Sequence, residues 1–188
     1  MQLTNCKVDI LCIIYAHSLY LPHIMKNLLL IRHAKSSWSD PSLADRDRPL
    51  NTRGKRDGPF MASYIRSKDL ILDRLLSSPA KRAYRTAKFF AKEFNSEVKD
   101  FSKESDLYFG SESDWMDLIN TLDEQYHFPA FFSHNPTITY FANAFIGNDF
   151  DNVPTCGVIH LRSSVDLWKD LHYDNTQVHN YYFPKHLQ

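Results

Sequence analysis

The chain has 188 residues, a length that suits one domain with a sizeable hydrophobic core. Its 22 basic residues balance 22 acidic ones, so the net charge gives no reason to expect nucleic acid or a membrane surface as a partner. Five glycines and no Gly-rich phosphate-loop pattern argue against the common nucleotide-binding loops. The three cysteines lack the spacing of a metal site and favour a reducing compartment, so we expect a cytoplasmic protein.

Residues 1–24 differ in character from the rest of the chain. Residues 8–21 are largely apolar, but Asp9 and His17 interrupt them and the stretch is short for a membrane span. No convincing signal-peptide cleavage site follows. We therefore interpret residues 1–24 as an N-terminal extension and residues 25–188 as the folded domain. A weak membrane anchor or an export signal is the alternative.

Strand-like and helix-like segments alternate beyond residue 25. Short apolar runs bounded by polar residues predict strands at residues 28–32, 70–76, 97–101, 130–132, 156–162 and 178–183. Apolar residues at helical spacing predict helices at about residues 52–68, 79–94, 113–122 and 136–144. This alternation predicts a three-layer α/β/α sandwich with a mostly parallel central sheet and no large cap insertion.

Polar residues mark where each predicted helix begins. The expected N-caps are Thr52, Ser78, Ser113 and Asn135. Gly58-Pro59 would kink the first helix or delay its start, because proline cannot donate the backbone hydrogen bond of a helix interior.

Three of the predicted strand ends carry residues that can handle a phosphoryl group. The first ends in Arg32-His33, the second leads through Ser78 to Arg82, and the fourth ends at His134. A helix N-terminus favours an anion, and an arginine presents a planar fork to phosphoryl oxygens. If the strands are neighbours in the sheet, these side chains converge on one crevice.

In these residues the chain resembles the histidine phosphatase superfamily, which includes the cofactor-dependent phosphoglycerate mutases. The matching motifs, in the family's order, are Arg32-His33-Ala34, residues 78–86 and residues 133–136. Its compact branch, typified by the phosphohistidine phosphatase SixA, is the most similar. Features of that branch are Arg48-Pro49-Leu50-Asn51 followed by Gly54, the lack of a large cap and the ending at residues 184–187. The resemblance extends from residue 25 to the C-terminus.

The resemblance implies roles for five residues. His33 would be transiently phosphorylated, Arg32 and Arg82 would clamp the phosphoryl group, and His134 would contact it from the other side. Arg48 would be the additional phosphate-binding arginine of the compact branch, although it could instead pair with acidic residues of its own loop. Nearby arginines disfavour a protonated imidazole, which suits a nucleophile. No metal or cofactor is required.

Two departures from the family pattern affect the predicted substrate. Ala34 replaces the usual glycine after the histidine, and no secure counterpart exists of the carboxylic acid that protonates an alkoxide leaving group. Phosphohistidine needs little such help, because its imidazole takes up a proton on its own ring. The acidic residues nearest in position are Asp45, Asp47, Glu104 and Asp106.

The sequence therefore predicts a metal-independent phosphatase that acts on phosphohistidine in a phosphorelay or phosphotransfer protein. A phosphatase of small phosphomonoesters is the first alternative. A non-catalytic module that binds phosphoproteins is the second. The expected partner is a phosphorylated protein or a small phosphorylated substrate, and we expect a monomer.

Overall fold

The computed structural model describes residues 25–147 and 150–187. The predicted N-terminal extension, residues 1–24, lies outside them. A six-stranded sheet forms the centre, with the strand order β3-β2-β4-β1-β5-β6. Its strands are β1 (Lys26–Arg32), β2 (Arg74–Ser77), β3 (Asp100–Lys103), β4 (Pro129–Ser133), β5 (Val158–Ser163) and β6 (Thr176–Tyr182). Strands β1 to β4 are mutually parallel, and β5 runs antiparallel to both of its neighbours.

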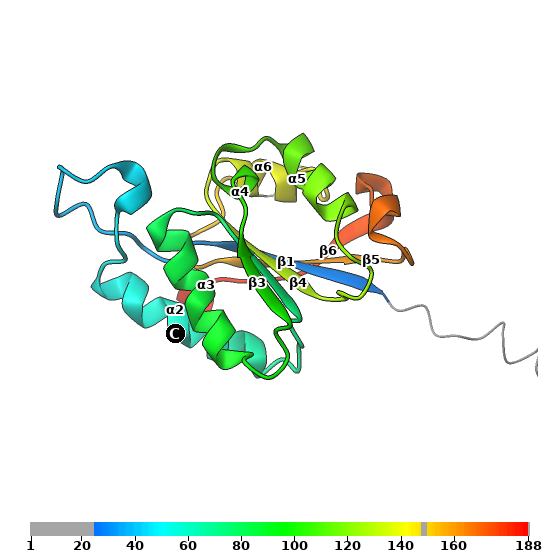
Figure 1. Cartoon of the computed structure of the whole chain (residues 1–188), viewed down its shortest axis with the longest axis horizontal. Helices are drawn as coiled ribbons and strands as arrows, with labels where there is room; N and C mark the ends of the chain where they lie inside the picture. The colour runs from blue at the N-terminus through cyan, green and yellow to red at the C-terminus, as the bar shows by residue number, and fades with distance from the viewer. Residues whose placement is uncertain (1–24, 148–149, 188) are drawn as a thin grey trace, which may run out of the picture.

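Helices cover both faces of this sheet (Figure 1). The helices on one face are α2 (Thr52–Arg66) and α3 (Lys81–Glu93). The helices on the other face are α4 (Asp106–Phe109), α5 (Glu112–Asn120) and α6 (Thr137–Asn143). Short 3-10 turns complete the fold: η1 (Asp45–Asp47), η2 (Trp168–Asp170), η3 (Tyr173–Asn175) and η4 (Pro184–His186). Within the described ranges, no helix has the length and apolarity needed to cross a membrane.

The alternation of side chains along β1 explains why residues 28–31 are continuously apolar. Leu28 and Leu30 pack in the core beneath α5 and α6, whereas Leu29 and Ile31 pack in the core beneath α2 and α3. A strand with helices on both faces has no solvent-exposed side, so alternating polar residues are absent. The predicted three-layer α/β/α class and the mostly parallel sheet are confirmed.

Several predicted helix starts are wrong by a few residues. The side chain of Asn51, not Thr52, caps α2, and α2 continues through Pro59 without a delayed start. Ser111, not Ser113, caps α5, because its hydroxyl and the Asp114 carboxylate form a reciprocal capping box.

The later junctions also differ from the prediction. Helix α3 begins at Lys81 instead of at residue 79, and Ser78 accepts a hydrogen bond from the amide of Ala80 at 3.2 Å. The Asn135 amide group does not cap α6 but donates to the Val153 carbonyl at 3.3 Å. Strand β2 is shorter than predicted, since residues 70–73 lie outside the ladder, and α4 had no predicted counterpart.

Gly54, in the first turn of α2, lets the backbone there pack closely against the residues that follow β1. A Cβ atom at Gly54 would overlap the backbone carbonyl of Lys35, so only glycine allows this approach. The amide of Asn51 donates to the Lys35 carbonyl at 3.0 Å, and the amide of Ser37 donates to the Pro49 carbonyl at 2.8 Å. These contacts fix the position of the chain that carries Arg48.

Gly54→Ala is expected to lower the free energy of unfolding by about 1–3 kcal/mol, since the added methyl group meets rigid backbone. Urea denaturation followed by circular dichroism measures the change. Lys55→Ala, an exposed site in the same helical turn, is the control and should shift stability by no more than ~0.5 kcal/mol. Equal midpoints for Gly54→Ala and the wild type would show that the approach is not tight.

Candidate active site

The sheet register places the candidate side chains at one edge. Arg32 at the end of β1 lies opposite Ser133 at the end of β4, and Ser77 at the end of β2 lies opposite Phe132. The three parallel strands therefore end almost level. Because ligand sites of parallel sheets lie beyond the carboxyl ends of the strands, the residues that follow them share one crevice. The structure brings His33, Arg82 and His134 together there.

His33 is buried, and its hydrogen bonds define its tautomer. Its Nδ1 lies 2.7 Å from the carbonyl oxygen of Ala34, which only accepts, so Nδ1 carries the proton. Its Nε2 accepts a hydrogen bond from Nε of Arg82 at 3.2 Å. The backbone amide of His33 donates to the Ser133 carbonyl at 3.0 Å, which ties the residue to β4. The lone pair of Nε2 is thus directed toward the arginine.

The carboxylate of Asp45 in η1 joins the two candidate phosphate-binding arginines. Its Oδ2 accepts from Nη2 of Arg82 at 2.8 Å and from the Tyr108 hydroxyl at 3.0 Å. Its Oδ1 accepts from Nη1 of Arg48 at 2.7 Å. The Asp45 side chain is 52% exposed, although both guanidinium groups are buried. An anion therefore already lies on the two guanidinium groups, and it is one that solvent can reach.

The guanidinium of Arg48 is fixed by further contacts. Its Nη2 donates to the Ser36 hydroxyl at 2.5 Å, and its Nε donates to the Ser37 carbonyl at 3.2 Å. Its central carbon lies 3.3 Å from the centroid of the Trp38 ring. Arg48 does pair with an acidic residue of its own loop, Asp45, as the alternative expected. The same carboxylate also binds Arg82, so this pairing holds the Arg48 guanidinium at the crevice.

Arg32 and His134 each retain an unused nitrogen. Nη1 of Arg32 donates to the Val153 carbonyl at 2.5 Å and to Asn152 at 3.1 Å, and Nε2 of His134 lies 2.7 Å from the Ser78 hydroxyl. Nε of Arg32 and Nδ1 of His134 are buried without a hydrogen-bond partner among residues 25–147 and 150–187. Unsatisfied buried polar atoms are costly, and a ligand is one way to satisfy them.

The two histidines are close to each other and are both neutral at physiological pH. Their ring centroids lie 4.9 Å apart. Burial, followed by the positive charges of Arg82 and Arg32, lowers the pKa of His33 to about 3, despite the opposing hydrogen bond to Ala34. Burial, followed by His33 and Arg82, lowers the pKa of His134 to about 2. The imidazole of His33 is thus in the form that a nucleophile requires.

Asp45 is not available as a proton donor. Burial raises the pKa of its carboxyl group, but hydrogen bonds from Arg82 and Tyr108 outweigh this effect, and the net change is downward. Asp47 is exposed, and Glu104 accepts from the hydroxyl of Ser102. In the described part of the chain, no carboxyl group forms a hydrogen bond with either site histidine.

Three contributors to the site were not assigned a role from the sequence. Ser78 was treated as a helix cap, but its hydroxyl contacts His134. Thr86 accepts a hydrogen bond from the Ala34 amide at 3.0 Å, and Tyr108 contacts both Asp45 and the edge of His134. Thr86 lies within the motif of residues 78–86, so the motif could have indicated its role in the site. Tyr108 lies in α4, which the sequence did not predict, and no sequence pattern indicated its role.

The described residues do not gather potential metal ligands at any point. No group of three or more histidine, cysteine, aspartate or glutamate side chains is arranged to hold a metal ion within residues 25–147 and 150–187. The crevice instead offers guanidinium, hydroxyl and imidazole groups, which are ligands for an oxyanion.

Two curated relatives match part of the chain. An uncharacterized chloroplastic protein of Arabidopsis thaliana is 43% identical over 65 residues, which are 35% of this chain and 30% of the relative. Phosphoserine phosphatase 1 of Hydrogenobacter thermophilus is 38% identical over 78 residues, which are 39% of this chain and 35% of that protein. The matches thus span about a third of the length of these relatives.

The fold and the family are also shared with known proteins. A structure assigned as phosphohistidine phosphatase SixA, from Agrobacterium tumefaciens, superposes with a TM-score of 0.72 at 24% identity, over 85% of this chain and 98% of that chain. The expected likeness to the compact branch is therefore met in the fold. The family model described as histidine phosphatase superfamily (branch 1) matches residues 28–127. On that match, the chain belongs to the histidine phosphatase superfamily.

Proposed function

We propose that the protein is a metal-independent phosphatase that forms a phosphohistidine at Nε2 of His33 and acts on phosphohistidine in a phosphorelay or phosphotransfer protein. The observation that carries the proposal is the neutral, buried imidazole of His33, whose unprotonated Nε2 faces Arg82. Together with Arg48, this arginine provides an oxyanion clamp around a nucleophile.

In the first step, the incoming phosphoryl group takes the place of the Asp45 carboxylate on Arg82 and Arg48. The Nε2 lone pair of His33 attacks phosphorus and the bond to the substrate nitrogen breaks. The leaving imidazole keeps that electron pair and departs as a neutral ring, because its other ring nitrogen already carries a proton from solvent. Fixed guanidinium groups offset charge on the equatorial oxygens during in-line transfer. The negative charge of the phosphoryl group also raises the pKa of His134 and favours a hydrogen bond from that ring.

In the second step, water attacks the phosphorus of phospho-His33. The bond between phosphorus and Nε2 breaks, inorganic phosphate leaves, and His33 returns to the tautomer that the Ala34 carbonyl selects. A covalent intermediate divides one difficult displacement into two easier ones.

The surroundings of the site favour a nitrogen-linked protein substrate. None of the described carboxyl groups forms a hydrogen bond with the histidines, which suits a leaving imidazole better than an alkoxide. Trp38 and Phe109 are 72% and 84% exposed, and Trp38 stacks on Arg48. Exposed aromatic rings beside a catalytic crevice suit contact with a protein. The expectations of a cytoplasmic monomer without a cofactor or a nucleic-acid partner belong to this proposal.

A phosphatase of small phosphomonoesters is the second candidate. One relative is named phosphoserine phosphatase 1, and the ring of Tyr108, whose hydroxyl donates to Asp45, lies against the ring of His134. A binding module without turnover is a third possibility, but a neutral histidine with a directed lone pair is not needed for binding alone.

His33→Ala is expected to abolish both turnover and labelling of the protein by phosphate, because it removes the unprotonated nitrogen that accepts a hydrogen bond from Arg82. The measurement uses a histidine-containing phosphotransfer protein phosphorylated with radiolabelled phosphoramidate, followed by detection of acid-labile phosphate on the enzyme. His127→Ala, an exposed histidine away from the crevice, is the matched control and should keep full activity. Initial rates on phosphoserine and p-nitrophenyl phosphate separate the two enzymatic candidates. Labelling that survives in His33→Ala would refute the mechanism.

Asp45→Asn is expected to tighten the binding of inorganic phosphate by about 2- to 5-fold, because a half-exposed ion pair no longer competes for the arginines. Isothermal titration calorimetry at neutral pH measures the dissociation constant. Asp47→Asn changes the same charge in the same turn without a contact to Arg82 and should leave binding unchanged. Weaker binding in Asp45→Asn would mean that the carboxylate helps to hold the anion.

The imidazoles of His33 and His134 are expected to stay neutral from about pH 5 to pH 8, because their pKa values of about 3 and about 2 lie far below the unperturbed 6.5. Their ring resonances in NMR spectra, assigned with single variants, should not titrate there. Since the unfolded chain binds more protons below pH 6.5, the free energy of unfolding should fall as the pH drops through and below this value. A His33 titration midpoint near 6.5 would contradict the geometry.

A further inference from the structure

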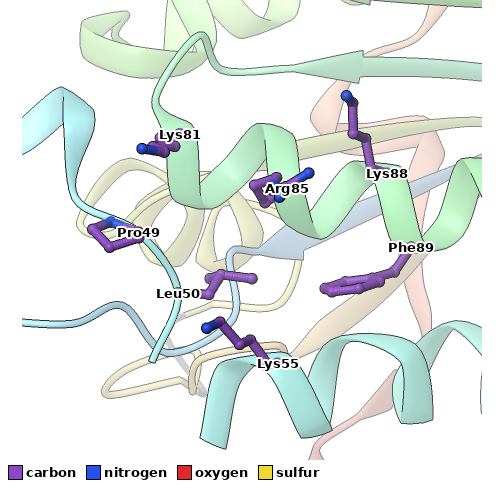
Figure 2. Close-up of a pocket in the computed structure, with 7 residues that line it drawn as sticks. All are labelled: Pro49, Leu50, Lys55, Lys81, Arg85, Lys88 and Phe89. Carbon is purple, nitrogen blue, oxygen red and sulfur yellow. The ribbon is translucent and has the colours of Figure 1, made fainter. Parts of the chain in front are cut away.

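A groove of about 490 Å³ lies between α2 and α3. We call it the basic groove (Figure 2). It is lined by Pro49, Leu50, Lys55, Lys81, Arg85, Lys88 and Phe89. Its volume is in the range of sites that bind a drug-sized ligand or a few residues of a peptide. No acidic residue lines it.

The four basic residues of the groove are exposed and lack acidic partners. In the described chain, none of Lys55, Lys81, Arg85 and Lys88 forms an ion pair. Lys88 lies instead over the ring of Tyr84, with Nζ 4.9 Å from the ring centroid. In a chain with no net charge, this is a local excess of positive charge that an acidic ligand would balance.

The floor between these charges is apolar. Figure 2 shows Leu50 and the ring of Phe89 lying between the two helices, with Lys81 and Arg85 coming from α3 and Lys55 from α2. A Cβ atom at Gly58 would overlap the Phe89 ring, so the glycine lets this ring pack against α2. Apolar side chains of a ligand can thus be buried between cationic groups.

The groove and the phosphoryl crevice are built from the same two segments. Pro49 of the groove follows Arg48, and Lys81 of the groove precedes Arg82. Both arginines bind the Asp45 carboxylate, on the crevice side of these segments. A polypeptide whose phosphorylated side chain enters the crevice can therefore extend its neighbouring residues along the groove.

We propose that the basic groove binds an acidic segment, containing apolar residues, next to the phosphohistidine of the substrate protein. This inference rests on the proposed function and names the feature by which that site selects a protein. A small phosphate ester held by Arg48 and Arg82 has no reach into the groove. A nucleic acid is less suited, because the floor between the charges is apolar, whereas a phosphate backbone has no apolar side chains to bury there.

The test compares two synthetic peptides that each carry one phosphohistidine, made with phosphoramidate. One has glutamates and leucines beside the histidine, and the other has serines and glycines. The wild type is expected to show a KM about 5- to 10-fold lower for the acidic peptide at low salt, with the preference lost at high salt. The double variant Lys55→Glu/Arg85→Glu should lose the preference and keep its kcat on p-nitrophenyl phosphate.

Lys92→Glu/Lys169→Glu reverses two exposed charges outside the groove and is the matched control, which should behave as the wild type. An equal preference in the groove variant and in this control would overturn the inference. So would tighter binding of a labelled oligonucleotide than of the unphosphorylated acidic peptide, measured by fluorescence anisotropy. That binding assay needs no turnover, so acidic-peptide binding that depends on Lys55 and Arg85 supports the groove even if no phosphopeptide is hydrolysed.

Discussion

A histidine that must remain uncharged among arginines is the constraint on which this site depends. His33 accepts a hydrogen bond from Arg82 while it donates one to the Ala34 carbonyl, and a neutral imidazole alone can do both. The surrounding guanidinium groups then require an anion to balance them. Three parallel strands that end almost level, with helices packed on both faces, hold these groups in place.

The layer architecture and the convergence of the motifs were accessible from the sequence, because both follow from regular patterns. A continuous apolar run such as residues 28–31 is typical of a strand buried on both faces. Polar residues directly after such runs must lie at the carboxyl edge of a parallel sheet. The juxtaposition of Arg82 and His134 with His33 follows once the strands are neighbours.

Contacts between segments distant in the sequence could not be predicted, because they follow no regular sequence pattern. Asn51 caps α2 in place of Thr52, and its own backbone amide donates to the Lys35 carbonyl, a distant contact that no local pattern reveals. Tyr108 contributes from a helix of four residues, too short to show a periodic pattern. The contact of Asp45 with Arg82 depends on how a polar loop folds back over α3, and this tertiary arrangement leaves no pattern in the local sequence.

The carboxylate of Asp45 has a consequence for the end of the catalytic cycle. It is tethered to the domain, so its local concentration beside Arg82 does not depend on what is dissolved in the surrounding solution. In the proposed mechanism, an internal anion thus replaces each departing phosphate, and no bare guanidinium groups are left behind. Any free anion must outcompete this tethered group to stay bound, so product retention and inhibition by ambient phosphate are both weakened. A pair of arginines that carries its own carboxylate accordingly needs more free phosphate to be saturated than a pair without one.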